Sequence, residues 1–443
     1  MAVTAEAPRL LIAGTGSGCG KTTVTCALLQ ALKERGYEVG AFKCGPDYID
    51  PMFHAEAIGA DSGNIDLFFS DADTARALFA SHARELNIIE GVMGFYDGLA
   101  MDSAEASACH VAKTLGAPVI LVVNASGMAL SAAAVVKGFQ SLDPEAPIAG
   151  VILNRVSKPV CDRLKPVIEK ECGVKVYGCL PKSPETALES RHLGLVTAAE
   201  IADIREKLHT LAVQAEECID IGALIDLMKA QPPVSGTLPD IEPVGHARIA
   251  VARDKAFCFY YRDNLALLEK LGAELVPFSP LEDTSLPDCD GLYLGGGYPE
   301  LYLERLAANR SMRASIREAV LGGLPTVAEC GGFMYLCKGM AEVFPHDVFN
   351  TGKLCRFGYV TLHAERDSLL FEAGDTCRAH EFHYWDASDP GSALKAVKPG
   401  GRSWRCAHVS DTLYAGYPHL YFYSDIKAAR RFVRACAERK TKA

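Results

Sequence analysis

LLIAGTGSGCGKTT, residues 10–23, is the stretch that decides the fold of the N-terminal half. Its first four residues are apolar and predict a short buried strand. The glycine-rich turn that follows lets backbone N–H groups face phosphate oxygens, and the next residues begin a helix whose N-terminus favours negative charge. Strand, glycine-rich turn and helix in this order predict a phosphate-binding loop that holds ATP.

The residues expected to bind ATP in this loop are Gly16, Gly18, Cys19, Gly20, Lys21, Thr22 and Thr23. Lys21 is placed to reach the β- and γ-phosphates, and the Thr22 hydroxyl is placed to bind Mg²⁺. The spacing departs from the usual pattern because Gly14 stands one residue early and Thr15 takes its place. This variant resembles the dethiobiotin synthetase branch of P-loop enzymes, whose members often phosphorylate a substrate carboxylate.

The rest of the first half alternates apolar runs with stretches of helical periodicity. Strands are predicted at residues 10–13, 39–43, 87–89, 118–123 and 148–153, with a helix at 21–35. This alternation favours an α/β fold in which helices cover both faces of a parallel sheet.

A Pro- and Gly-rich stretch, QPPVSGTLPDIEPVG at residues 231–245, has no helical or strand period and predicts an interdomain linker. Beyond it, strands are predicted at 248–252, 275–278 and 291–294, with a helix at 263–271. The expected organisation is an ATP- and substrate-binding domain at 1–230, a linker, and a second α/β domain at 246–443. The last seven residues, AERKTKA, are expected to fray.

Composition excludes several classes of protein. The 443 residues favour two or three domains, and a net charge of -10 argues against a general nucleic-acid binder, which needs a basic surface. No stretch reaches the roughly 18 apolar residues of a membrane span. The first residues, MAVTAEAPR, do not resemble a signal peptide, and the 16 cysteines include no CxxC pair. We therefore expect a cytoplasmic protein with free thiols.

Acidic residues follow two of the predicted strands. Asp47 and Asp50 lie in KCGPDYIDP, residues 43–51, and Glu90 opens EGVMGFYDG, residues 90–98. Ligands of a parallel sheet bind beyond the carboxyl ends of its strands, and Mg²⁺ prefers carboxylate and phosphate oxygens. We therefore expect Thr22, Asp47 and Glu90 to hold Mg²⁺.

Asn154 follows the strand predicted at 148–153. Its amide is expected either to read the adenine base or to occupy a turn, where Asn is also common.

A thiol site is predicted in LPTVAECGGFMYL, residues 324–336. The segment reads as strand, tight turn and helix, and resembles a nucleophile elbow with Cys330 exposed on the turn and small residues beside it. We expect the helix N-terminus to lower the pKa of Cys330. Oxyanion stabilisation and glutamine binding are assigned to the backbone of Gly295, Gly296, Gly297 and Gly331.

The nucleophile also needs a base. His419 in the late segment LYAGYPHLYF is the first candidate, and His383 in HEFHY is the alternative. A phosphate-loop half joined to a thiol half suggests a coupled reaction. The thiol half releases ammonia from glutamine, and the ATP half activates a carboxylate as an acyl phosphate, which ammonia converts to an amide.

Six segments carry a wider resemblance: GTGSGCGKTT, KCGPDYIDPMFH, EGVMGFYDG, LGGGYPEL, AECGGFMYL and RAHEFHYW. In this order, and over nearly the whole chain, they resemble the cobyrinate a,c-diamide synthase family of glutamine-dependent amidotransferases. The resemblance implies a dethiobiotin-synthetase-like ATP domain joined to a class I glutaminase domain. It implies amidation of the a and c acetate side chains of cobyrinate with ATP, Mg²⁺ and glutamine.

Residue roles also follow from the resemblance. It implies Cys330 as the nucleophile and His419 as the histidine that activates it, although Pro418 stands here where the family tends to have Leu. The substrate is assigned to Lys43, Asp47, Tyr48, Ile49, Asp50 and Asp97.

The resemblance leaves the macrocycle open. Close relatives act on hydrogenobyrinate or nickel sirohydrochlorin, and cobyric acid synthase is a more distant relative that the PDYIDP segment disfavours. A regulatory P-loop ATPase is an alternative of another class, but it has no glutaminase half. The expected partners are a tetrapyrrole, glutamine and ATP, with neither nucleic acid nor membrane, and a homodimer is the candidate assembly.

Overall fold

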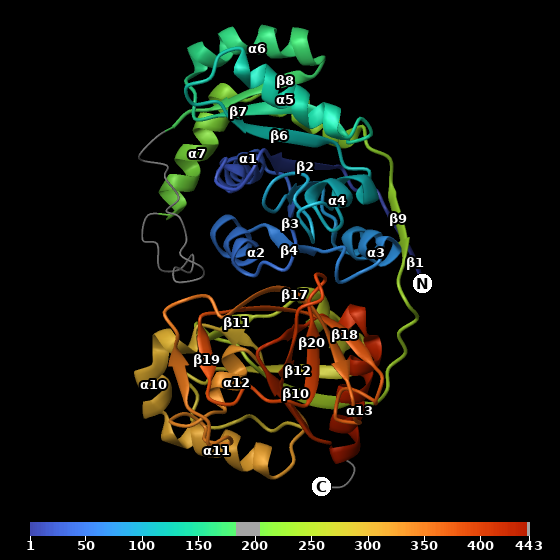
Figure 1. Ribbon diagram of the computed structural model, residues 1–443, viewed down its shortest axis with the longest axis vertical. Helices are drawn as coiled ribbons and strands as arrows, with labels where there is room; N and C mark the ends of the chain where they lie inside the picture. Colours follow the sequence, from blue (N-terminus) through green and yellow to red (C-terminus); the bar gives the residue numbers. More distant parts are fainter. Residues whose placement is uncertain (183–203, 441–443) are drawn as a thin grey trace. The chain divides into compact units, whose positions relative to one another are not determined.

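The computed structural model describes residues 1–182 and 204–440 and divides the chain into two compact units, Met1–Pro239 and Asp240–Ala443 (Figure 1). Each unit has an α/β architecture with its own sheet and buried core, which confirms the predicted fold class. None of the helices in the described ranges is long and apolar enough to cross a membrane.

The first unit is built on seven parallel strands in the order β4-β3-β5-β2-β6-β7-β8. Along the chain these are β2 (Arg9–Gly14), β3 (Val39–Cys44), β4 (Asp61–Ile65), β5 (Leu86–Glu90), β6 (Val119–Asn124), β7 (Ile148–Asn154) and β8 (Lys175–Leu180). Every strand predicted for this half is confirmed. The sequence did not predict β4, which reads DSGNI and is too polar to show an apolar run.

Helices cover both faces of this sheet (Figure 1). On one face, Leu10 and Ile12 of β2 pack into a buried cluster with α1 (Lys21–Glu34), α7 (Ile204–Cys218) and α8 (Ile221–Lys229). Helices α4 (Ala108–Leu115) and α5 (Ser131–Leu142) contact β2 and β6 but add nothing to that cluster, so they cover the opposite face. Further helices are α2 (Ile49–Phe53), α3 (Ala72–His82) and α6 (Lys158–Cys172).

The second unit holds a six-stranded sheet in the order β12-β10-β13-β15-β23-β22. Its strands are β10 (Ala247–Ala252), β12 (Ala273–Phe278), β13 (Gly291–Leu294), β15 (Thr326–Glu329), β22 (His408–Val409) and β23 (Leu413–Gly416). All neighbours are parallel except β22, which runs antiparallel to β23 at the edge. The predicted helix is confirmed as α9 (Arg262–Lys270), and α11 (Arg310–Leu321) and the short α12 (Gly331–Tyr335) follow.

A second sheet in this unit was not predicted. It is antiparallel and has the order β21-β20-β17-β18-β24, with β17 (Arg356–Ala364), β18 (Thr376–His383), β20 (Leu394–Val397), β21 (Ser403–Cys406) and β24 (His419–Leu420). Its strands alternate buried and exposed residues instead of forming continuous apolar runs. Pairing of β18 with β24 sets His380 opposite His419.

Two segments predicted to be irregular are partly regular, although the boundary between the two units, after Pro239, falls inside the predicted linker. Within the predicted linker, β9 (Val234–Thr237) pairs antiparallel with β1 (Ala2–Ala5), because its alternate residues are buried and Gly236 approaches the backbone of α3. Helix α13 (Ile426–Lys440) continues through most of the stretch expected to fray, and residues 441–443 lie outside the described residues.

Candidate active site

The phosphate loop joins β2 to α1. Gly20 caps α1 with φ 101°, and a Cβ atom there would overlap the side chain of Asn154, so the turn requires glycine. Lys21 folds back over the loop, where its Nζ donates to the carbonyls of Gly16, at 3.1 Å, and Met93. Burial lowers the pKa of Lys21. The loop is therefore closed around its own lysine.

Asn154, at the end of β7, holds this loop by a side-chain hydrogen bond. Its Nδ2 donates to the Cys19 carbonyl at 2.8 Å, and its Oδ1 accepts the Arg155 N–H at 2.9 Å. Both ends of the amide thus have protein partners, and adenine recognition by Asn154 stays a prediction.

Glu90 is fully buried at the end of β5, and its carboxylate contacts three side chains. Thr22 donates its hydroxyl to Glu90 Oε1 at 2.6 Å, and Lys43 Nζ donates to the same oxygen at 2.8 Å. His54 Nε2 lies 3.4 Å from Oε2. Burial alone would raise the pKa of Glu90, but Lys43 and then His54 outweigh it, so its pKa is lowered. Glu90 is therefore an ionised group at the phosphate loop.

Lys43 connects Glu90 to the loop after β3. Its Nζ also donates to Asp50 Oδ2 at 2.7 Å. Burial would lower the pKa of Lys43, but Asp50 and Glu90 outweigh it and hold the pKa well above its usual value. The cation is therefore retained in a buried position.

Asp47 has a structural task in the same loop. Its Oδ1 accepts the N–H groups of Ile49, at 2.8 Å, and Asp50, at 3.3 Å, at the start of α2. Burial, and then Asp50, raise the pKa of Asp47 to about 6. Asn64 holds the loop from β4 by donating to the Asp47 carbonyl at 2.7 Å. Tyr48 between these residues is buried.

The predicted Mg²⁺ ligands are only partly brought together. A P-loop hydroxyl and a carboxylate, from Thr22 and Glu90, are in direct contact, and this donor set suits Mg²⁺ beside a phosphate. Asp47 instead caps α2. Across residues 1–182 and 204–440, no acid, histidine or cysteine trio that includes Glu90 comes within 4.8 Å.

The segment after β5 closes over the phosphate loop. Gly91 and Phe95 donate their N–H groups to the carbonyls of Ile12 and Gly14, both at 2.9 Å. Asp97 accepts the Gly94 N–H at 2.7 Å, and its charge acts on Lys21. Asp97 therefore belongs to the same site as the phosphate loop.

In the second unit, Cys330 occupies a strained turn between β15 and α12. Its φ is 48° and ψ is -103°, and its N–H donates to the Gly416 carbonyl at 2.7 Å. A Cβ atom at Gly332 would overlap the carbonyl of Leu294, which explains the small neighbour. The turn predicted from the sequence is confirmed.

Two expectations about the thiol are wrong. Cys330 is buried, not exposed. Burial, and then the nearby Glu300 carboxylate, raise the pKa of the Cys330 thiol. The five-residue helix α12 does not compensate for desolvation, so the resting thiol is neutral.

The glycine segment lies against this turn. Gly296–Gly297 form β14, which pairs with β11 (Phe257–Phe259), and the Gly297 nitrogen would lie 3.2 Å from a Cβ atom at Gly331. Gly295 differs from its neighbours because its N–H donates to the hydroxyl of Tyr260 at 2.8 Å. Within the glycine segment, Gly297 is therefore the residue whose backbone lies against Gly331 of the nucleophile turn.

His419 packs directly on these glycines, since a Cβ atom at Gly296 would overlap its ring. Burial, and then His380 and His383, lower the pKa of His419 to about 3, so the imidazole is neutral. The alternative base, His383, has partners at both nitrogens: the Trp385 carbonyl, 2.6 Å from Nδ1, and Glu381, 3.3 Å from Nε2. The choice of His419 as the base stays a prediction.

Comparisons with known proteins match both units. A CobQ/CobB/MinD/ParA nucleotide binding domain matches residues 10–196, and a CobB/CobQ-like glutamine amidotransferase domain matches residues 248–426. Relatives called cobyrinate a,c-diamide synthase from Methanothermobacter thermautotrophicus, Salmonella typhimurium and Caldanaerobacter subterraneus are 43%, 41% and 40% identical. They cover 96%, 93% and 96% of this chain and 99%, 94% and 98% of their own.

The chain belongs to the cobyrinate a,c-diamide synthase family. The resemblance found in the sequence is thereby confirmed. As a member of this family, the protein is a carbon–nitrogen ligase that takes its nitrogen from glutamine, and its first unit is a nucleotide-binding domain.

Three further residues, which the sequence did not indicate, contact candidate site residues. His54 and Glu329 stand inside the segments that carried the resemblance, and Asn64 lies on the polar strand β4. Glu329 on β15 accepts the Leu420 N–H at 3.0 Å and the Tyr293 hydroxyl at 3.1 Å. Its Oε2 lies 3.9 Å from His419 Nδ1. These contacts join residues far apart in the sequence, so they show only in the folded chain.

Glu329 generates a prediction about stability and pH. Burial raises its pKa from 4.5 to about 8, so the folded state holds a proton that the unfolded state releases. The free energy of unfolding should therefore fall between about pH 4.5 and 8, and Glu329→Gln, which mimics the protonated acid, should remove about 4–5 kcal/mol of that fall.

Urea unfolding followed by tryptophan fluorescence measures this effect, because both tryptophans, Trp385 and Trp404, lie in the second unit. The difference between Glu329→Gln and the unaltered protein should grow from pH 5 to pH 8. If the free energies of unfolding of the two proteins changed in parallel with pH, folding would not raise the pKa of Glu329, and the prediction would be wrong.

Proposed function

We propose that this enzyme amidates the a and c acetate carboxylates of cobyrinate, in cobalamin biosynthesis, through acyl phosphate intermediates. One observation carries the proposal: relatives of that name cover almost the whole chain, including both the phosphate loop and the thiol turn. The same chemistry on hydrogenobyrinate or nickel sirohydrochlorin is the alternative.

In the glutaminase half, neutral His419 takes the proton of the Cys330 thiol when glutamine arrives. The sulfur attacks the carboxamide carbon, and backbone N–H groups of Gly297 and Gly331 stabilise the oxyanion. The C–N bond breaks as His419 returns the proton to the departing ammonia. Water then cleaves the thioester and releases glutamate. Burial favours the neutral thiol of Cys330 and the neutral imidazole of His419, which supports a first step in which the thiol gives its proton to the imidazole.

In the ATP half, a substrate carboxylate oxygen attacks the γ-phosphorus and ADP leaves. Ammonia attacks the carbonyl carbon of the resulting acyl phosphate, loses a proton, and phosphate departs with the former carboxylate oxygen. Lys21 exchanges its two carbonyl partners for phosphate oxygens. Thr22 and Glu90, with Asp47 as the further candidate, would hold Mg²⁺, which neutralises phosphate charge when bound.

The substrate is assigned to the loop after β3 and the segment after β5. Lys43, Asp47, Tyr48, Ile49, Asp50 and Asp97 are the residues concerned. The contact of Lys43 with both Asp50 and Glu90 supports a common site for the substrate carboxylate and the phosphate.

The function is tested by mass spectrometry of the product from purified enzyme, ATP, Mg²⁺ and glutamine. With cobyrinate, two successive exchanges of a hydroxyl for an amino group are expected. Parallel reactions with hydrogenobyrinate and nickel sirohydrochlorin test the two alternative substrates. Turnover of one of those without turnover of cobyrinate would replace the proposed substrate.

The first functional prediction separates the two halves. Cys330→Ala should lose glutamine-dependent amidation but keep amidation with a high concentration of ammonium salt, because external ammonia bypasses the thiol. His419→Ala should act in the same direction, and His383→Ala serves as the matched histidine control. Loss of both activities in Cys330→Ala, or the bypass pattern only in His383→Ala, would contradict these assignments.

The second prediction concerns the phosphate loop. Lys21→Ala should reduce amidation about 100-fold or more with either nitrogen source, because the cation stabilises the transferring phosphoryl group. Glutamine hydrolysis without ATP should change little. Initial rates with glutamine and with ammonium measure both effects, and near-normal amidation would remove Lys21 from the phosphoryl transfer.

The third prediction concerns the order of the two amidations. Ile49 is half-buried at the start of α2, beside the buried Tyr48. If they set the position of the macrocycle, Ile49→Ala and Tyr48→Phe should slow the second amidation more than the first, because the monoamide must bind again with another acetate forward. Met52→Ala on the same helix is the control. Time courses that resolve monoamide from diamide decide it, and equal slowing of both steps would leave only a packing role.

A further inference from the structure

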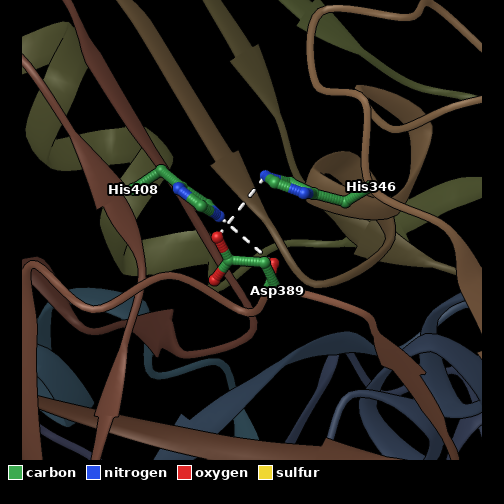
Figure 2. Close-up of side chains that lie close together, drawn as sticks. All are labelled: His346, Asp389 and His408. Atoms are coloured by element: carbon green, nitrogen blue, oxygen red, sulfur yellow. Dashed lines mark hydrogen bonds and ion pairs between the residues drawn. The ribbon is translucent and has the colours of Figure 1, made fainter.

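A trio of potential metal ligands lies in the second unit, apart from the residues of the proposed reaction. His346 precedes β16 (Val348–Asn350), Asp389 follows β19 (Trp385–Ala387), and His408 begins β22. One ligand atom from each lies within 4.8 Å of the others, and in the described ranges no other trio of His, Cys, Asp or Glu does so. Figure 2 shows the two rings and the carboxylate turned toward one another.

The distances approach those of a metal site. His346 Nε2 lies 3.7 Å from Asp389 Oδ2, whereas His408 Nε2 forms a hydrogen bond of 3.2 Å with the main-chain carbonyl of Asp389 (Figure 2). Ligands about 2.0–2.2 Å from a tetrahedral ion stand roughly 3.3–3.6 Å apart. The three ligand atoms lie within 4.8 Å of one another, so they must move closer together to bind one ion. Asp389 is exposed and His346 is partly exposed, so both have room for that movement.

The backbone already holds the three segments together. Asp347 and Ser388 exchange hydrogen bonds beside two of the ligands, at 2.8 and 3.1 Å. The N–H of Gly391 donates to Asp389 Oδ1 at 2.9 Å, which leaves Oδ2 facing His346. Much of the entropy cost of assembling a site is therefore met by the fold.

An aromatic layer supports the two imidazoles. The rings of His346 and His408 stack with centroids 5.0 Å apart, and Phe344 packs on both, 5.7 and 4.7 Å away. Phe333 of α12 contacts His408 at 5.7 Å.

We propose that His346, Asp389 and His408 bind a divalent first-row transition-metal ion of the Zn²⁺ class. Two imidazoles and one carboxylate suit such an ion better than Mg²⁺ or Ca²⁺, which prefer oxygen ligands. Exposure of Asp389 leaves a fourth position to solvent. The ion connects three segments around Phe333, three residues beyond Cys330, and stabilises the second unit there.

Thiols are the main competitors in a test, since all 16 cysteines are free. Co²⁺ distinguishes the two kinds of site, because thiolate ligands give intense near-ultraviolet charge-transfer bands and nitrogen and oxygen ligands do not. The full chain is treated with chelator and titrated with Co²⁺ by equilibrium dialysis and absorption spectroscopy. The thermal midpoint of the second unit is followed by tryptophan fluorescence with Co²⁺, Zn²⁺ or Mg²⁺.

His346→Gln and Asp389→Asn are the informative variants, because both positions are at least partly exposed and the amide introduced by Asp389→Asn keeps an oxygen to accept the Gly391 N–H. His363→Gln on β17 is the matched control, since His363 is an exposed histidine of the same unit. Glutamine hydrolysis in chelator checks that each variant is folded.

One Co²⁺ per chain without thiolate bands is expected, and both variants should weaken it about tenfold or more while the control does not. Co²⁺ and Zn²⁺, but not Mg²⁺, should raise the thermal midpoint of the unaltered protein and of the control alone. Binding that shows thiolate bands, binding that both variants leave unchanged, or no stoichiometric binding would each overturn the proposal.

Discussion

The buried ion pair between Lys43 and Glu90 is the constraint on which the ATP half depends. The two residues face each other in register at the carboxyl ends of β3 and β5, so the parallel pairing itself brings the charges to 2.8 Å. A fully buried carboxylate is tolerated only with such a partner. Thr22 binds the same carboxylate and Asp50 the same ammonium, so the phosphate loop and the loop after β3 are both positioned by this pair.

Burial has the opposite result in the second unit. There it shifts the pKa values of Cys330, His419 and Glu329 toward their neutral forms. Since a neutral thiol reacts slowly, the attack on glutamine first needs transfer of the thiol proton. The ATP half, in contrast, holds an ion pair, Lys43–Glu90.

Much of this arrangement was predictable because it is local. Glycine turns directly after apolar strands located the phosphate loop and the Cys330 turn, and every strand predicted in the first unit is present. The five-stranded antiparallel sheet was not predicted, since its strands alternate buried with exposed residues. His54, Asn64 and Glu329 acquire their contacts from residues far away in the sequence, and the burial that raises the pKa of Cys330 depends on the same packing.

Strand direction also explains why the cluster of His346, Asp389 and His408 lies close to the thiol. β22 is the one antiparallel member of its sheet, and its first residue, His408, pairs with Ala415 near the carboxyl end of β23. The next residue, Gly416, accepts the N–H of Cys330. A strand entering from the opposite direction thus begins at the edge where the parallel strands end. An ion bound there would act on the support of the nucleophile turn.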